Sequence, residues 1–232
     1  MLPADLAAAE AETLAALQQA LQAQGSLRWS VEWRFEGLRL LAPVLRLQRA
    51  LLGLNRVVLL VCSDAGAAAL ARRDAPDLAD QVVDFRQLQQ QQEQQLQQAS
   101  EAVLLVLAPA AADYESFEPL CNAHRGPVVM VNGRLEDAAV GIGSVARQRR
   151  KGFVSTWSSA YSLIPLDGGA LRHAYPGDWE LYRLDADGYR AVCSFEQKPD
   201  TEAMAAALSG DGGSGVAGTL RAVDALIEGL RG

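Results

Sequence analysis

The sequence has few of the residues from which most catalytic and metal sites are built. Its 232 residues include two histidines and three cysteines, Cys62, Cys121 and Cys193, and no two cysteines form a C-x-x-C pair. A sparse and odd set of cysteines argues against a disulfide framework and indicates a reducing compartment. Since no H-E-x-x-H, G-x-S-x-G or Walker A sequence occurs either, we expect no metal ion, no cofactor and no catalytic residue of a common class.

Long apolar runs and an excess of positive charge are also missing. The longest apolar runs, at 57–62 and 102–108, have the length of strands and fall far short of the roughly 20 residues that span a bilayer. The first residues, Met-Leu-Pro followed by acidic side chains, lack the features of a signal peptide. The formal net charge is −7, and a negative field disfavours nucleic acid. We therefore expect a cytoplasmic protein that does not bind nucleic acid.

The residues that are abundant favour a globular α/β protein. Half of them are hydrophobic, which is enough for one sizeable core. Apolar, β-branched runs at 56–62, 102–108 and 128–131 predict buried strands, and helical patterns lie between them. Strands that alternate with helices are typical of a parallel sheet with covering helices.

The N-terminal region adds one helix and one half-buried strand. Leucines at helical spacing predict an amphipathic helix over 4–24. In 27–35, apolar residues such as Trp29 alternate with polar ones, so one face of this strand is expected in the core. We expect Glu32 and Arg34 on its exposed face.

The pattern changes after residue 150. Strands are predicted at Phe153–Leu166, Trp179–Leu184 and Tyr189–Glu196. The last two flank Asp185-Ala-Asp-Gly188, whose turn residues favour an antiparallel hairpin. The predicted fold is therefore a single three-layer α/β domain over residues 1–232. It has a mostly parallel central sheet in its N-terminal part, extended by antiparallel strands in its C-terminal part, with helices on both faces.

Residues 87–98 are almost entirely glutamine, and two interpretations are open. The tract is either a low-complexity interaction segment or a solvated helix, because Phe85, Leu88 and Leu96 would share one helical face. Under the first interpretation the protein would be a scaffold that contacts its partner through this tract.

Two glycine-rich stretches match the spacing of a dinucleotide-binding fingerprint, Gly141–Ala146 and Gly210–Gly218. Such a site needs a strand that runs directly into the glycines and a helix that follows them. The first stretch lies well past the nearest predicted strand, and the second follows a predicted helix. We interpret the second as a flexible connector and keep the first as a weak anion-binding candidate.

One basic cluster stands out against the acidic background. Arg147, Arg149, Arg150 and Lys151 lie close together near the predicted start of a helix. Such a cluster can grip a phosphate, a carboxylate-rich partner or lipid head groups, but it also fits an ordinary solvated helix face. Arg147 and Arg150 are three positions apart, so they would share a face and could hold one anion together.

A more specific pattern lies between residues 147 and 182. It reads RQRRKGFVSTW, then YSLIPL from Tyr161 and, after a Gly-Gly turn, YPGDWELY from Tyr175. This stretch resembles the DUF1995 family of cyanobacterial and chloroplast domains, and further similarity, as in 56–71, extends the resemblance to nearly the whole chain. Tyr161, Tyr175 and Trp179 are candidates for partner or ligand contact, with a purely structural role in the core as the competing interpretation.

The resemblance implies a role in the photosynthetic apparatus rather than a chemical reaction. A plant member of the family, Low PSII Accumulation 3, helps to assemble photosystem II and acts with the chlorophyll-binding protein CP43. By this resemblance the chain is a non-catalytic assembly or binding factor, cyanobacterial and peripheral at the thylakoid membrane. Its partner would be a photosystem II subunit such as CP43. The family has no agreed catalytic residues to carry across.

A second function stays open beside the first. Parallel α/β sheets commonly bind ligands in the crevice at the carboxyl ends of their strands. The chain could therefore be an enzyme or sensor that binds a small phosphorylated ligand, either in that crevice or at the arginine cluster.

Overall fold

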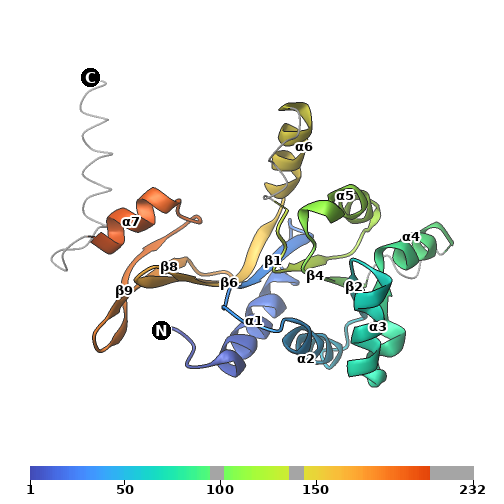
Figure 1. The fold of residues 1–232 in the computed structure, drawn as a ribbon, viewed down its shortest axis with the longest axis horizontal. Helices are drawn as coiled ribbons and strands as arrows, with labels where there is room; N and C mark the ends of the chain where they lie inside the picture. Colours follow the sequence, from blue (N-terminus) through green and yellow to red (C-terminus); the bar gives the residue numbers. More distant parts are fainter. Residues whose placement is uncertain (95–101, 136–143, 210–232) are drawn as a thin grey trace.

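The computed structural model describes residues 1–94, 102–135 and 144–209. In these ranges nine strands form one sheet in the order β3-β2-β4-β5-β1-β6-β7-β8-β9 (Figure 1). Their bounds are β1 Arg28–Trp33, β2 Val58–Cys62, β3 Val82–Asp84, β4 Val103–Leu107, β5 Val128–Val131, β6 Ser158–Leu166, β7 Gly169–Ala174, β8 Trp179–Asp185 and β9 Gly188–Phe195.

The sheet has a parallel and an antiparallel part, as the sequence predicts. The strands from β3 to β6 in spatial order are parallel neighbours, whereas β7, β8 and β9 continue from β6 as an antiparallel meander. The change falls at β6, which pairs in parallel with β1 and antiparallel with β7. Strand β6 therefore joins the two parts of the sheet.

Helices cover both faces of the parallel part. Figure 1 shows α1, α2 and α3 below the sheet, and α4, α5 and α6 above it. Leu17, Val44 and Ala68 of the lower helices belong to one core cluster, and Leu88 and Phe117 of the upper helices belong to another. Helix α7 packs on the antiparallel part through Ala207. The bounds are α1 Leu6–Ala20, α2 Leu41–Leu52, α3 Ala65–Asp74, α4 Phe85–Gln94, α5 Tyr114–Ala123, α6 Ser144–Val154 and α7 Thr201–Ser209, with short 3-10 helices at Pro76–Gln81 and Ala111–Asp113.

Aspartates begin two of the lower helices. The Asp5 carboxylate accepts a hydrogen bond from the Ala8 backbone amide at 2.8 Å, and Asp64 accepts one from Ala67 at 2.9 Å. Each carboxylate satisfies a backbone amide that the first helical turn leaves unpaired.

The predicted strand Phe153–Leu166 is wrong in its first residues. Helix α6 runs on to Val154, and β6 begins only at Ser158. The reason is tertiary, because Phe153 is buried against Phe117 and Trp157 in an aromatic cluster. A run of β-favouring residues therefore ends a helix here.

The glutamine tract is helical as far as it is described. Helix α4 includes Phe85 and Leu88, which are buried, and the exposed Gln89 and Gln90. This pattern agrees with the solvated-helix interpretation over residues 85–90, where side-chain exposure is described. The remainder of the tract, 95–98, lies outside the described residues.

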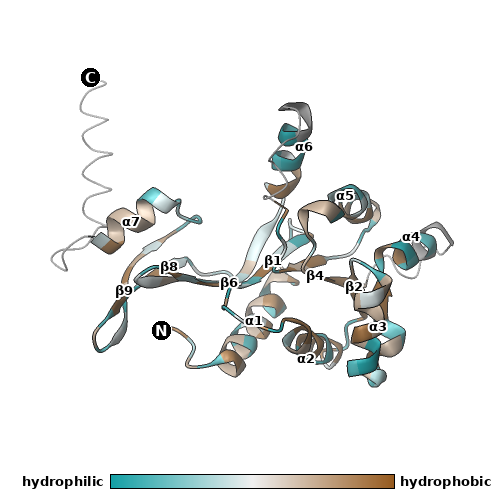
Figure 2. Ribbon diagram, in the orientation of Figure 1, coloured by the Kyte–Doolittle hydropathy of each residue, from teal (hydrophilic) through white to brown (hydrophobic). Residues whose placement is uncertain are grey.

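Hydrophobic residues are concentrated in the central strands (Figure 2). Of the helices in the described ranges, none combines the length and the hydrophobicity needed to cross a membrane.

Candidate functional site

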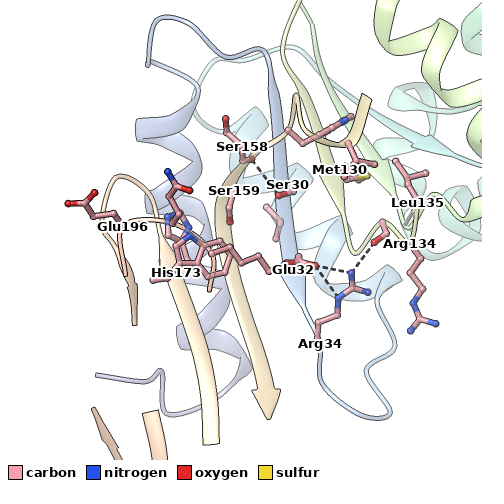
Figure 3. A pocket seen from close by; sticks show the side chains of 17 residues that line it. Ser30, Glu32, Arg34, Met130, Arg134, Leu135, Ser158, Ser159, His173 and Glu196 are labelled. Atoms are coloured by element: carbon pink, nitrogen blue, oxygen red, sulfur yellow. Dashed lines mark hydrogen bonds and ion pairs between the residues drawn. The ribbon is translucent and has the colours of Figure 1, made fainter. Parts of the chain in front are cut away.

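A cavity of about 720 Å³ lies on the upper face of the sheet, over β1 and β6. Trp157 of the aromatic cluster lines it. Glu196, in the segment after β9, lies across the cavity from Met130 and Leu135 (Figure 3). The lining residues are Ser30, Val31, Glu32, Arg34, Met130, Gly133, Arg134, Leu135, Val154, Trp157, Ser158, Ser159, His173, Trp179, Glu196, Gln197 and Lys198.

The alternation of apolar and polar side chains along β1 creates the floor of this cavity. Trp29, Val31 and Trp33 are buried in the lower core cluster. Because successive side chains of a strand point to opposite faces, Glu32 and Arg34 project to the upper face. The alternation in the sequence correctly predicts which of these side chains face the lower core and which face the other side. The expectation that Glu32 lies on an exposed face is wrong. The segment after β9 covers it, and its side chain is only 16% exposed.

Glu32 is held between two cations. It accepts hydrogen bonds from Arg34 Nη2 at 2.9 Å and from Lys198 Nζ at 3.0 Å, and Ser162 Oγ donates to it at 3.3 Å. Burial alone would raise the pKa of the carboxyl. The charge of Lys198 and the hydrogen bonds from Arg34 and Lys198 outweigh burial, so the pKa of Glu32 is lowered. The group is thus an ionised carboxylate rather than a general acid.

His173 and Trp179 form a stacked wall of the same cavity. Their ring centroids are 4.6 Å apart, and Lys198 Nζ lies 5.4 Å from the Trp179 ring centroid. Burial, more than any nearby charge, lowers the pKa of His173 to about 4. The imidazole is therefore neutral near pH 7. Its Nδ1 atom and the indole Nε1 of Trp157 are buried and have no hydrogen-bond partner among the described residues.

A second cavity of about 550 Å³ lies at the carboxyl ends of β1, β4 and β5. Here the helices after β1 and β5, which are α2 and α6, lie on opposite faces of the sheet, so this is a topological switch point. Asn132 fixes its edge, because its amide side chain accepts from the Trp33 backbone amide at 2.6 Å and donates to the Trp33 carbonyl at 2.7 Å. Arg34 and Arg134 border both cavities.

The predicted basic cluster lies on α6 and lines neither cavity. Arg147 and Lys151 are exposed, one helical turn apart, and no ion pair joins either of them to another described residue. Arg149 forms an ion pair with Glu118 at 2.6 Å.

Arg150 lies against α5 instead. Its guanidinium lies 4.6 Å from the Tyr114 ring centroid and 3.6 Å from Glu115, and its side chain is 16% exposed. The structure therefore does not bring Arg147 and Arg150 together on one free face.

The three predicted aromatic residues have different environments. Tyr161 is fully buried, and its hydroxyl donates to Glu12 at 3.1 Å. Tyr175 packs edge-on against Trp29 at 4.9 Å between ring centroids. Only Trp179 lines a cavity. Tyr161 is therefore a core residue that a partner could reach only by unfolding the sheet.

The histidine and cysteine side chains have buried, weakly ionised environments. Burial lowers the pKa of His124, whose Nε2 lies 2.8 Å from the Ala102 carbonyl oxygen. Burial raises the pKa of Cys62 to about 11 and that of Cys121 to about 12, so both thiols are protonated near pH 7.

Sequence reasoning missed the cavity residues Lys198, Ser30 and Ser159. The only signal for Ser30 is the polar alternation of 28–34, which resembles that of an ordinary solvated strand face, and no pattern in the sequence marks Ser159 or Lys198. Of the two glycine-rich stretches, Gly210–Gly218 and all but the last three residues of Gly141–Ala146 lie outside the described residues.

The comparison with known families agrees with the sequence resemblance. A family model described as a domain of unknown function (DUF1995) matches residues 3–206. No curated protein matches the chain significantly. Because the family match covers most of its length, the chain belongs to the DUF1995 family.

Proposed function

We propose that the protein is a non-catalytic binding factor that assists assembly of the photosynthetic apparatus, with a photosystem II subunit such as CP43 as its partner. The exposed basic face of α6 is the observation that carries the binding role. Membership of the DUF1995 family supports the choice of partner. The proposal includes a cyanobacterial origin and a position at the thylakoid surface.

Helix α6 is built to present charge away from the body of the protein. It projects from the upper face of the sheet (Figure 1), and its projecting part is hydrophilic (Figure 2). Phe153 anchors its end in the aromatic cluster, and Arg150 is stacked on Tyr114. These contacts leave Arg147 and Lys151 exposed at positions i and i+4, which share one face of a helix.

This face suits an acidic partner. The chain has a net charge of −7, so cations on a projecting helix are a local exception in an acidic surface. Ions of opposite charge steer association and set orientation more than they add affinity. We therefore infer that the Arg147–Lys151 face docks on an acidic, solvent-exposed loop of a membrane-protein subunit.

Affinity capture from solubilised thylakoid membranes tests this proposal. Wild-type protein should retain a photosystem II subunit, and the double variant Arg147→Glu, Lys151→Glu should lose it. The matched control is Arg39→Glu, Arg73→Glu, which makes the same change in net charge at exposed positions away from α6. The control should retain the subunit.

Two results would contradict the proposal. Equal capture by the α6 variant and the wild type would remove α6 from the interface. Binding of the wild type to protein-free anionic vesicles, with no subunit captured, would instead make α6 a lipid-binding helix.

A further inference from the structure

The sheet-face cavity carries excess positive charge. Among its described lining residues, Arg34, Arg134 and Lys198 face only two carboxylates, Glu32 and Glu196, and His173 is neutral near pH 7 because its pKa is about 4. The cations Arg34 and Lys198 share a single partner, Glu32. Among the described residues, the triad of Arg34, Glu32 and Lys198 therefore carries one more positive than negative charge beside the cavity, in a protein whose net charge is −7.

Two buried polar atoms in the wall call for partners. Trp157 Nε1 and His173 Nδ1 are buried without a hydrogen-bond partner among the described residues, and the His173 side chain is itself more than nine-tenths buried. Buried polar groups in native proteins are almost always hydrogen-bonded. Both atoms have almost no accessible surface, so a ligand in the cavity would contact the rings of Trp157 and His173 rather than these nitrogens.

The polar groups are distributed along the cavity in an ordered way. Ser158 and Ser159 lie at one end, and Arg34 and Arg134 extend towards the other end, where β1 finishes (Figure 3). Apolar Met130 and Leu135 lie on the side between them. The volume of about 720 Å³ is within the usual range for small-molecule sites.

We propose that this cavity binds a small organic anion of nucleotide size or smaller. The acid group, a phosphate or a carboxylate, would lie by Lys198 and Arg34, because the uncompensated positive charge is there. The body of the ligand would lie against the Trp157 ring, which lines the cavity. This site is separate from the α6 face, so it does not rest on the proposed assembly role.

Paired probes test the charge requirement. The thermal midpoint of the full chain would be measured with uridine monophosphate against uridine, and with benzoate against benzyl alcohol, each at millimolar concentration. At least one acid should raise the midpoint by about 3 °C or more while its neutral counterpart does not. The pair that responds distinguishes a phosphate ester from a carboxylic acid.

Three variants then separate a binding site from a merely structural triad. Lys198→Met should weaken binding of the responding acid about tenfold, because a charged hydrogen-bond donor is lost. Glu32→Gln should lower the stability of the fold but raise its affinity for the acid severalfold, because the substitution removes a carboxylate that repels the acid. Trp157→Phe should weaken binding, whereas Trp29→Phe should leave it unchanged. Trp29 has an equally unpartnered buried indole nitrogen, but it lies in the core on the other face of the sheet.

The decisive feature is that Glu32→Gln should lower the stability of the protein while it raises the affinity for the acid. A triad that only holds the segment after β9 would lose stability and affinity together. That result would overturn the proposal. So would equal shifts of the thermal midpoint by the acids and their neutral counterparts, or no shift with any of the four probes. Failure of the membrane capture experiment would leave these outcomes unaffected.

Discussion

At the scale of single residues, Glu32 joins segments that are far apart in the sequence. It links β1 to β6 through Ser162 and to the segment after β9 through Lys198. Its carboxylate is mostly buried but fully supplied with donors, which is the condition under which a buried charge is tolerated. One side chain thus ties the parallel part of the sheet to the end of the antiparallel part.

The pKa of Glu32 predicts how stability depends on pH. Because its pKa in the folded protein lies below the ordinary value of 4.5, ionised Glu32 stabilises the fold above about pH 4.5, and this contribution is lost as pH falls through the folded-state pKa. Glu32→Gln should therefore lower the free energy of unfolding by about 1–3 kcal/mol at pH 7. Urea unfolding at pH 7 and at acidic pH would measure both values.

The matched control is Glu36→Gln, at an exposed carboxylate four residues along the chain. It should change stability by less than about 0.5 kcal/mol. The account of Glu32 would be contradicted if the effect of Glu32→Gln were as small as that of the control, or if it grew as pH decreased.

At the scale of elements, α1 is tied to the sheet by a charged network. Arg172 of β7 bonds Glu12 of α1 at 3.0 Å and Glu180 of β8 at 2.7 Å. The hydroxyls of Tyr161 and Tyr182 complete it by donating to Glu12 and Glu180. The network spans the four elements α1, β6, β7 and β8 and is largely shielded from solvent at Arg172, which is 16% exposed.

A double-mutant cycle measures how much the ion pair between Arg172 and Glu12 contributes to stability. Arg172→Met and Glu12→Gln, alone and together, should give a coupling energy of about 1–2 kcal/mol in urea unfolding. The control cycle uses Arg46 and Glu10, a pair at 2.6 Å that joins α1 to α2 with its arginine 51% exposed. Its coupling should be about 0.2–1 kcal/mol, because solvent screens exposed pairs. Equal couplings would show that shielding at Arg172 adds nothing.

Element prediction from the sequence succeeded where periodicity and turn chemistry act locally. The buried runs at 58–62 and 103–107 and the hairpin around Asp185–Gly188 are visible because few other structures suit such residues. The boundary between α6 and β6 failed because contacts with α5, distant in sequence, decide it. No local pattern reports such contacts.

The candidate site was less predictable than the fold for the same reason. Lys198 and Glu32 are far apart in the sequence, and the charge pair exists only because the segment after β9, the edge strand, lies back over the face of the sheet at β1. Arg150, by contrast, was expected to be available for an anion and is held by Tyr114 and Glu115. Sequence spacing gives the helical face but not the neighbours of that face.

At the scale of the whole molecule, two candidate binding surfaces lie at different places. The basic face of α6 projects from the upper side of the sheet, whereas the sheet-face cavity lies between the aromatic cluster and the segment after β9. A protein with both features could bind a macromolecular partner and a small ligand at the same time. The partner surface is the central claim, because the proposed assembly role depends on it.

Site-specific cross-linking tests that claim most directly. A photo-reactive side chain would replace Gln148, which is exposed on α6 between Arg147 and Arg149, and in a matched control Gln19, which is exposed on α1 below the sheet. Illumination with thylakoid membranes should give an adduct of a photosystem II subunit from position 148 and none from position 19. The absence of an adduct at 148, or equal adducts at both positions, would contradict the assignment of α6 as the docking surface.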